Sequence, residues 1–427
     1  MTVIKSVRAR RIWDSRGRPT VEVEVVTEDG FTGIGIAPAG ASMGTREAVE
    51  LRDGGKAFGG LDVQTALRRV QDEIAPLLIG RPVADQQGID AALIALDGTP
   101  NKARLGGNAM IATSLAVLHA AAAQARLPLW RYLAGDGPTT LPLPQIQIFG
   151  GGAHAGRRVD VQDFMVIAVG ASSFQQALEM TAEVYRSAGE IMRARGGMQG
   201  IADEGGWWPN FSRNEEALDV LVASIEAAGF IPGTDVGIAL DIAASEFGRN
   251  GKYQLALEGS TLDSDGLCEK LLGWVEKYPI VSIEDPLGED DEAGLIAFTQ
   301  AVAGKVQVVG DDYLVTNAKL VREAAQKGAC NTVLIKPNQA GTVTETHEAL
   351  LAAKKAGYST IVSARSGETE DVAIVHLATG WNAGQLKVGS FARSERMAKW
   401  NEAIRIETGD VRPGGFAGAA ALASKNY

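Results

Sequence analysis

The sequence predicts an α/β protein with a smaller N-terminal α+β domain and a larger C-terminal β/α barrel. Strand-like sequence followed by helical sequence near the N-terminus indicates the first domain, and strands alternating with helices through the rest of the chain indicate the second. In addition, five apolar runs end in a polar or charged group, as parallel barrel strands do where their C-terminal ends line one mouth. These groups are Glu204, Asp241, Glu284, Asp311 and Lys336.

The N-terminal elements follow from residue periodicity. Residues 21–25 alternate apolar and polar side chains, which is typical of a half-buried antiparallel strand. We expect strands over 3–13, 20–27 and 31–37, and helices over 46–52, 63–79, 86–96 and 109–126. A Leu-Pro-Leu-Pro run at 141–144 then interrupts the pattern. We therefore expect a domain boundary near residues 135–142, giving an N-terminal domain of 1–137 and a barrel domain of 138–427.

Helical sequence separates the strand-like runs of the predicted barrel. We expect these helices over 173–195, 214–228, 267–277 and 344–356. The Gly/Ala-rich segment 414–423 predicts a loosely held tail.

The composition of the chain excludes some classes of binding partner and some cellular locations. A net charge of −11 argues against nucleic acid and anionic membranes, because both require basic surface. The two cysteines, Cys268 and Cys330, are too few for a disulfide framework and are expected to be reduced. No apolar segment resembles a signal peptide or a membrane span, so we expect a cytoplasmic protein.

Three strand-end acids suggest a metal site. A single acid after a strand often only caps the next helix. Asp241, Glu284 and Asp311 occur in strand order, however, and the next strand ends in Lys336. This set offers oxygen ligands without a Cys or His cluster, which favours Mg²⁺.

Two of the remaining polar groups have catalytic and structural interpretations. Lys336, desolvated near a metal, could act as a base, or it could form a salt bridge to a ligand carboxylate. Glu204 could be a general acid opposite Lys336, or a turn residue before two glycines. Arg365 with Ser366 before a helix suits phosphate, and Lys387 adds a cation at the last strand.

These residues and their surroundings resemble the enolase family along almost the whole chain. The motifs that carry the resemblance are Arg-Arg-Ile-Trp-Asp-Ser-Arg-Gly-Arg-Pro-Thr-Val-Glu-Val, Gly-Ala-Ser-Met-Gly, Leu-Asp-Gly-Thr-Pro-Asn-Lys, Asp-Glu-Gly-Gly, Ser-Ile-Glu-Asp-Pro, Arg-Ser-Gly-Glu-Thr-Glu-Asp and Ala-Arg-Ser-Glu-Arg. The resemblance implies a modified β/α (TIM-like) barrel with an α+β capping domain. It also implies Mg²⁺ dependence, a phosphorylated, anionic small-molecule substrate, and a homodimer or higher homo-oligomer.

Carried over residue by residue, the resemblance implies two Mg²⁺ ions. Asp241, Glu284 and Asp311 would hold the first ion, and Ser42 would help to bind the second, which arrives with the substrate. 

The implied catalytic and binding roles are equally specific. Lys336 would remove the proton α to the substrate carboxylate, Glu204 would help the β-hydroxyl to leave, and Lys387 would support the developing enolate charge. The implied substrate-binding residues are Ser42, His154, Gln162, Arg365 and Ser366.

Several residues depart from the family pattern around one expected pocket. Asp163 stands where the family has a second catalytic glutamate, and Ala364 replaces a histidine. Both changes fall on the side that handles the leaving hydroxyl, whereas the enolate-forming groups are retained. The other departures are Met43, Gly150, Trp207 and Trp208, with Arg157 and Arg158 as added charges on the flap that carries His154.

Three functions therefore stay open at the level of sequence. The first is abstraction of the α-proton of 2-phosphoglycerate, or a close phosphorylated three-carbon acid, through a metal-stabilised enolate, giving phosphoenolpyruvate. The second is a diverged homologue of phosphonate biosynthesis, similar to carboxyphosphonoenolpyruvate synthase, which joins the three-carbon unit to an activated phosphonate. Arg157, Arg158 and the two tryptophans would suit such a larger anionic co-substrate. The third is an inactive homologue with a binding role, against which the intact Lys336 and Glu204 count.

Overall fold

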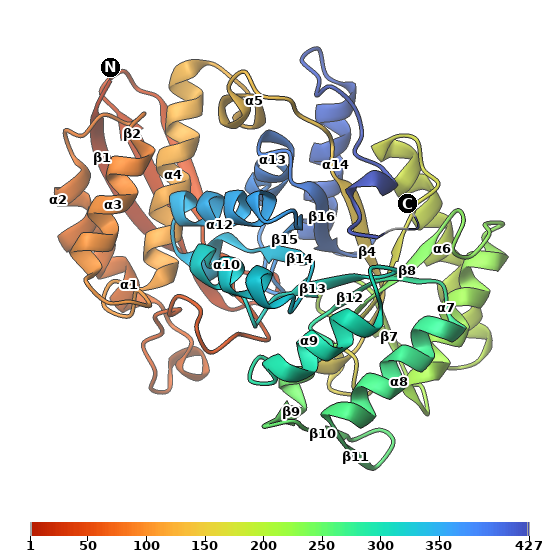
Figure 1. Ribbon diagram of the computed structural model, residues 1–427. Coiled ribbons are helices and arrows are strands. Elements are labelled where there is room, and N and C mark those ends of the chain that lie inside the picture. Colours follow the sequence, from red (N-terminus) through yellow and green to blue (C-terminus); the bar gives the residue numbers. More distant parts are fainter. Residues whose placement is uncertain (1, 425, 427) are drawn as a thin grey trace.

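The computed structural model describes residues 2–424 and 426 (Figure 1). The N-terminal domain begins with an antiparallel sheet of β1 (Ile4–Trp13), β2 (Pro19–Thr27) and β3 (Thr32–Ile36), in that order. In β2, the buried Val21, Val23 and Val25 alternate with partly exposed glutamates, as the sequence predicts. The three expected strands are thus present within one or two residues at each end.

The helices of this domain pack on one another and on the sheet. They are the short helix η1 (Ala57–Gly60), α1 (Gln64–Arg69), the π-turn η2 (Val70–Ile74), α2 (Ala75–Leu78), α3 (Gln86–Asp97), α4 (Gly107–Ala125) and α5 (Leu129–Ala134). Helix α4 approaches the sheet closely because β3 carries glycines: a Cβ built at Gly35 would lie 2.3 Å from the carbonyl oxygen of Ala112.

The helix predicted over 46–52 is wrong, because this segment is irregular. Its backbone bonds to other parts of the chain instead of to itself. The Ala48 N–H donates to the Gln339 carbonyl (2.9 Å), and the Val49 N–H donates to the Asn101 carbonyl (2.8 Å). The segment therefore joins the N-terminal domain to the barrel.

Eight strands form a closed barrel in the C-terminal domain. In ring order they are β4 (Leu143–Gly150), β5 (Asp163–Ile167), β8 (Gly237–Asp241), β12 (Ile280–Glu284), β13 (Gln307–Gly310), β14 (Thr332–Ile335), β15 (Ser359–Ser363) and β16 (Gly384–Gly389). Pairing of β16 with β4, for example Gln385 opposite Leu143, closes the ring. Strand β5 is antiparallel to both β4 and β8, so the barrel is modified as the resemblance implied.

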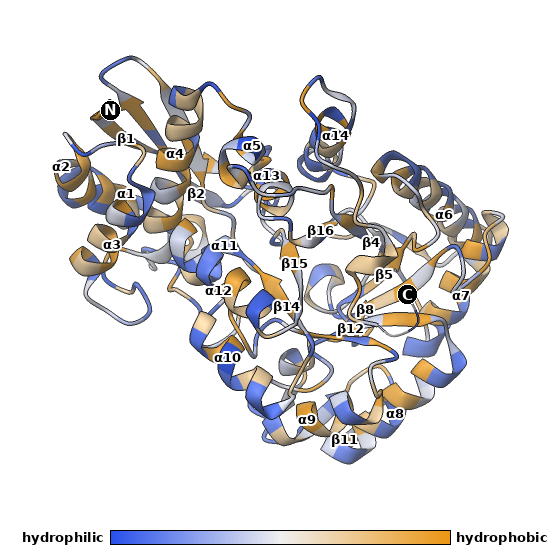
Figure 2. Cartoon of the chain, turned by 45° about the horizontal axis from the view of Figure 1, so that its top comes forward, coloured by the Kyte–Doolittle hydropathy of each residue, from blue (hydrophilic) through white to orange (hydrophobic). Residues whose placement is uncertain are grey.

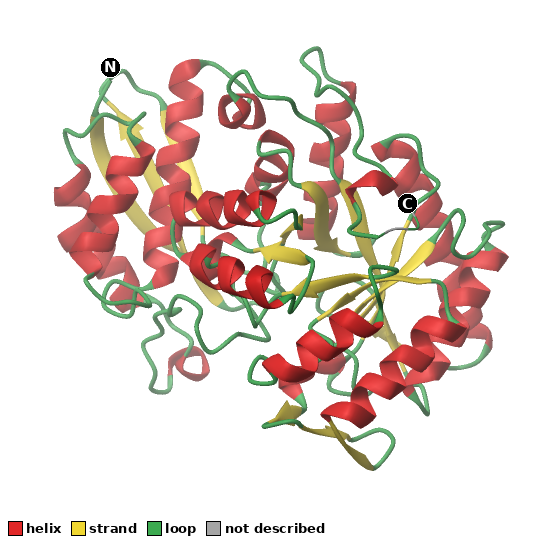
Figure 3. Cartoon of the chain, in the orientation of Figure 1, coloured by secondary structure: helices red, strands yellow, loops and turns green. Residues whose placement is uncertain are grey.

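Helices surround the barrel (Figure 3). They are α6 (Phe174–Ala194), α7 (Asn214–Ala227), α8 (Ser264–Lys277), α9 (Glu292–Ala301), α10 (Ala318–Lys327), α11 (Pro337–Ala340), α12 (Val343–Lys355), α13 (Ala373–Gly380) and α14 (Ser394–Thr408). Strands such as β14 and β15 are mostly hydrophobic, whereas α8 and α10 alternate hydrophilic and hydrophobic surface (Figure 2). Side-chain caps start several helices, among them Ser173 for α6 and Thr342 for α12. None of the described helices is long and apolar enough to cross a membrane.

Short strands and 3₁₀ turns lie outside the ring of eight strands. They are β6 (Met198–Ile201), β7 (Trp207–Pro209), β9 (Gly248–Arg249), β10 (Lys252–Leu255), β11 (Ser260–Asp263) and the 3₁₀ turns η3 (Gly152–Ala155), η4 (Ala244–Glu246) and η5 (Ala419–Ala421). Strand β6 pairs with β7 and lies outside the ring of eight. The expectation that Glu204 ends a barrel strand is therefore wrong, since Glu204 lies on the turn between β6 and β7.

The predicted loose tail over 414–423 is also wrong. Leu422 packs with Leu143, Met165 and Ala239 beneath the barrel. The Gln385 side-chain amide donates to the Ala421 carbonyl (2.9 Å). The tail thus covers the N-terminal ends of the parallel strands.

Candidate active site

Charged side chains gather at the C-terminal mouth of the barrel, where the parallel strands end. Asp241 closes β8, Glu284 closes β12, Lys387 lies in β16, and Lys336 follows β14. All are buried. Asp241, Lys336 and Lys387 border a cavity of about 20 Å³, enough for roughly one water molecule.

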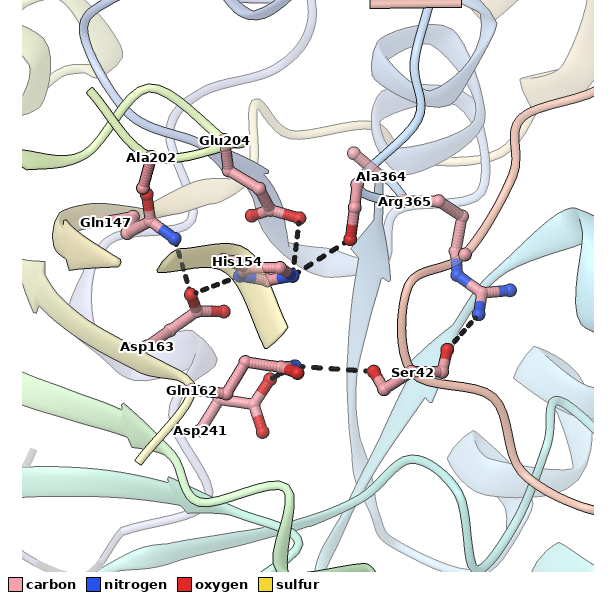
Figure 4. A network of polar contacts seen from close by, with 12 residues as sticks. Ser42, Gln147, His154, Gln162, Asp163, Ala202, Glu204, Asp241, Ala364 and Arg365 are labelled. Atoms are coloured by element: carbon pink, nitrogen blue, oxygen red, sulfur yellow. Dashed lines mark hydrogen bonds and ion pairs between the residues drawn. The ribbon is translucent and has the colours of Figure 1, made fainter. Parts of the chain in front are cut away.

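Most of the predicted site residues line this cavity. They are Ser42, His154, Gln162, Asp163, Glu204, Asp241, Lys336, Arg365, Ser366 and Lys387. Ser42 arrives from the N-terminal domain, so both domains enclose the site (Figure 4). Glu284 and Asp311 lie one contact further out, against the two lysines.

Lys387 lies between two of the predicted metal ligands. Its Nζ is 2.8 Å from Asp241 Oδ2 and 2.8 Å from Glu284 Oε2. Burial disfavours the charged lysine, but Asp241 and Glu284 outweigh it and hold the pKa of Lys387 well above its ordinary value. Burial, reinforced by Asp241, raises the pKa of Glu284 well above its usual range. Its Oε1 atom is buried without a hydrogen-bond partner.

Lys336 pairs with Asp311, the third predicted ligand. Burial opposes the lysine charge, but Asp311 outweighs it and raises the pKa of Lys336. For Asp311, burial is outweighed by Lys336 and Arg365, which lower its pKa. Its Oδ1 accepts from the Gln339 amide (2.9 Å). In this arrangement the ammonium groups of Lys336 and Lys387 offset the negative charge of the buried carboxylates.

The donor set suits a divalent cation. Hard carboxylate oxygens come from Asp241, Glu284 and Asp311, and the partnerless buried Oε1 of Glu284 leaves an electron pair free for an ion. Among the described residues, two groups have ligand atoms that all lie within 4.8 Å of one another: Asp285 with Asp311 and Asp312, and His154 with Asp163 and Glu204. Of the three predicted ligands, only Asp311 belongs to such a group. Asp285 accepts from the N–H groups of Asp311 and Asp312 (2.9 Å each), which shapes the turn after β13.

The side of the site that carries the departures forms a second network (Figure 4). His154 Nδ1 lies 2.9 Å from Asp163 Oδ1, and its Nε2 lies 2.9 Å from Ser366 Oγ and 3.7 Å from Glu204 Oε1. Burial disfavours protonation of His154, but Asp163 and Glu204 outweigh it and raise its pKa to about 9. Burial is likewise outweighed at Asp163, whose pKa is lowered chiefly by His154. The network therefore contains an imidazolium beside carboxylates.

Arg365 connects the barrel to the N-terminal domain. Its guanidinium donates to Glu47 Oε2 (3.0 Å) and to the Ser42 carbonyl (2.9 Å). The pKa of Arg365 is raised, since Glu47 outweighs burial. Behind it, the fully buried Arg396 of α14 donates to the carbonyls of Arg365 (2.7 Å) and Val388 (3.0 Å). A candidate anion site is thus braced from both sides.

Two of the positions that depart from the family pattern, Asp163 and Ala364, lie at the cavity wall. Ala364 lines the cavity and adds no polar group to it. Gln162 donates to Asp241 Oδ2 (3.1 Å) and lies 3.4 Å from Ser42 Oγ.

The added arginines and tryptophans do not line the cavity. Arg157 pairs with Glu246 (2.8 Å), and Arg158 donates to Asn210. Trp207 stacks on Tyr185, with ring centroids 4.6 Å apart. Trp208 packs beneath the flap at Gly156. Binding of a co-substrate by these side chains stays a prediction.

Four polar residues of the site lacked a sequence signal strong enough to be singled out. Asp285 and Asp312 each directly follow an acid that is a predicted metal ligand. The dipeptides Glu-Asp and Asp-Asp are the sequence features that could have pointed to them. Glu47 lies in the segment 46–52, whose pattern predicts a helix that does not form. Gln147 lies in the middle of β4, where a polar residue in an apolar run was the only sign.

Comparison with known proteins agrees with this architecture. The model of the enolase N-terminal domain matches residues 4–133, and the model of the enolase C-terminal TIM barrel domain matches residues 138–425. Enolase 1 of Desulfitobacterium hafniense (strain Y51) is 51% identical over 407 residues, which cover 95% of this chain and 93% of the relative.

Proposed function

Since the chain belongs to the enolase family of lyases, we propose that it removes the α-proton of 2-phosphoglycerate, or of a close phosphorylated three-carbon acid, to give phosphoenolpyruvate. The observation that carries this proposal is that Lys336 and Glu204 line one buried cavity together with Lys387. A base, an acid and a fixed cation around one small space are what α-proton removal followed by hydroxide loss requires.

Each residue has a proposed part in the reaction. Lys336 accepts the α-proton in its neutral form, after its ammonium has given up a proton, and Lys387 offsets the charge that grows on the substrate carboxylate. Glu204 donates a proton to the leaving β-hydroxyl, with the protonated His154 at 3.7 Å to supply positive charge. Arg365 and Ser366 hold the phosphate, and closure between the two domains excludes water.

The cofactor we propose is Mg²⁺, as two ions of which the second arrives with substrate. Asp241, Glu284 and Asp311 would hold the first, and Ser42 would contribute to the second. When bound, the ions would supply positive charge that offsets the substrate carboxylate and phosphate.

One assay tests the activity. The purified protein is incubated with Mg²⁺ and 2-phosphoglycerate in D₂O, while α-proton exchange is followed by NMR and phosphoenolpyruvate by ultraviolet absorbance. We expect exchange together with dehydration. Absence of both, with Mg²⁺ binding confirmed by calorimetry, would refute the proposal and favour a binding role.

A second candidate is the diverged synthase of phosphonate biosynthesis. The observation that favours it is that Asp163 already pairs with His154 and is therefore not free. Ala364, which also lines the cavity, has no polar side-chain group. Exchange without dehydration would support this candidate. The double substitution Ala364→His with Asp163→Glu should then raise dehydration, because it returns a donor and a longer acid to that wall.

We also propose a cytoplasmic location, a homodimer or higher homo-oligomer, and a domain boundary between residues 137 and 138. The family match, the absence of a membrane-crossing helix among the described residues and the start of β4 at Leu143 support these proposals.

A further inference from the structure

One buried amide on the barrel wall contacts both Asp163 and the turn that carries Glu204. Gln147 lies in β4 and is 1% exposed. Its Oε1 accepts from the Gly206 N–H (2.8 Å). A backbone N–H can only donate, so this contact fixes the orientation of the amide. The Nε2 group must therefore face Asp163, to whose Oδ1 it donates.

Asp163 has two competing cationic neighbours. Its Oδ1 lies 2.9 Å from His154 Nδ1, whereas its Oδ2 lies 3.6 Å from Lys387 Nζ and has no hydrogen bond. A short acid in this position could turn toward either one. The Gln147 amide gives Asp163 Oδ1 a second donor beside His154, and it thereby keeps the carboxylate turned toward the histidine.

The same amide holds the turn that carries Glu204. Gly206 lies two residues after Glu204 and has no room for a side chain, because a Cβ there would lie 2.4 Å from Gln147 Oε1. The neighbouring Gly205 is in a left-handed conformation (φ 94°), against the Ala392 carbonyl. Gln147 thus connects Asp163 to the turn of Glu204 through one rigid group.

We propose that Gln147 is a positioning residue that holds Asp163 on His154 and sets the distance between His154 and Glu204. Its structural part stands on these contacts alone. Its kinetic part rests on the function proposed above, because only then do His154 and Glu204 assist the leaving hydroxyl.

The structural part is tested by NMR of the imidazole protons. The chain has only four histidines, so the spectrum is sparse, and His154→Gln assigns the signal of the Nδ1 proton that faces Asp163. The test variant is Gln147→Leu. Its matched control is Gln145→Leu, which removes another buried amide from the same face of β4, where Gln145 donates to Gln385 (2.8 Å) away from the cavity.

We expect the His154 signal to be lost in Gln147→Leu and kept in Gln145→Leu. Persistence of the signal in both variants would overturn the proposal. If Gln147→Leu does not fold, Gln147→Glu replaces it, because this isosteric change keeps the acceptor for Gly206 and replaces the donor to Asp163 with a carboxylate oxygen that repels it.

Kinetics in the same variants test the second part. With 2-phosphoglycerate we expect Gln147→Leu to lower kcat roughly tenfold or more with KM within about threefold, and Gln145→Leu to leave both near the wild-type values. The double variant Gln147→Asn with Asp163→Glu shortens one side chain of the contact by a methylene and lengthens the other by the same amount. Compared with Gln147→Asn alone, it should recover the His154 signal and most of kcat. Failure of that recovery would count against the direct contact. A wild-type protein without exchange or dehydration would refute the proposed function, while the NMR result would still decide the role of Gln147.

Discussion

The two buried lysines at the barrel mouth have different partners. Lys387 lies 2.8 Å from both Asp241 and Glu284, whereas within the described part of the chain Lys336 forms an ion pair with Asp311 alone. Lys387 thus has two carboxylates to hold it as a fixed cation. Lys336 would be freed once Asp311 is engaged elsewhere. This difference supports Lys336 as the base and Lys387 as the group that offsets charge.

Replacing Lys336 tests this assignment. We expect Lys336→Ala to lower α-proton exchange by roughly 10²–10⁴-fold, because no other described group at the cavity is proposed to accept that proton. The measurement is deuterium incorporation into 2-phosphoglycerate. Lys102→Ala is a matched control, since Lys102 is also buried and paired, with Glu345 at 2.6 Å, but lies away from the cavity. Exchange at the wild-type rate in Lys336→Ala would contradict the assignment.

The imidazolium of His154 makes stability depend on pH. The pKa of His154 is about 9 in the folded protein and about 6.5 when unfolded, so its contribution is complete below pH 6.5 and is lost as pH rises through 9. Relative to His154→Gln, the wild type should lose roughly 3 kcal/mol of unfolding free energy over this window. Urea unfolding at several pH values between 6 and 10 measures the difference. Parallel pH profiles for the two proteins would show that His154 is neutral when buried.

At the scale of elements, the reversal of β5 explains which parts of the site the sequence could predict. Parallel strands bring their C-terminal ends to one mouth, so Asp241, Glu284 and Lys336 were predicted from their position after apolar runs. Strand β5 is antiparallel and brings its first residue, Asp163, to the same mouth. Periodicity contains no sign of strand direction, so only the family resemblance pointed to Asp163.

Other elements were unpredictable for reasons of packing. The segment 46–52 has a helical pattern but bonds to Gln339 and Asn101 across the molecule, because tertiary contacts override a weak local preference. Glu204 was placed at the end of a barrel strand, whereas the two glycines after it allow a tight turn outside the ring. Gln147 required knowledge of which side chains face one another across the barrel.

The contact between β3 and α4 gives a prediction at this scale. Gly35→Ala should destabilise the protein by roughly 1–3 kcal/mol or more, because its Cβ would lie 2.3 Å from backbone that cannot move freely. Gly273→Ala on the exposed face of α8 is the control, since a Cβ there meets nothing within 4 Å. That change should be neutral or stabilise the helix by up to about 1 kcal/mol. Equal chemical denaturation midpoints for the two variants would contradict the packing argument.

At the scale of the whole molecule, polar contacts join the two domains at several places. Arg365 of the barrel pairs with Glu47 (3.0 Å), and Lys102 of the N-terminal domain pairs with Glu345 (2.6 Å). Asp90 on α3 accepts from the N–H and the hydroxyl of Thr344, at 2.9 and 2.6 Å. The N-terminal domain therefore helps to cap α12, a helix of the barrel.

We expect these contacts to make unfolding a single transition. Asp90→Ala should cost roughly 3 kcal/mol, because it leaves the half-buried donors of Thr344 and the buried hydroxyl of Ser114 without this partner. Asp85→Ala, on the same helix but exposed, should cost only about 1 kcal/mol through loss of the N-cap. Far-UV circular dichroism and tryptophan fluorescence should report the same midpoint in each variant. Two separate midpoints in the wild type would show that the domains unfold independently.

The pairing of β4 with β16 has a consequence for synthesis on the ribosome. Gln145 and Gln385 bond to each other although they are 240 residues apart. At translation rates of about 5–20 residues per second, the first barrel strand waits roughly 12–48 s for its last neighbour. During that time one edge of a growing, apolar sheet is exposed to other nascent chains. Assistance from chaperones should therefore matter most between the emergence of β4 and that of β16.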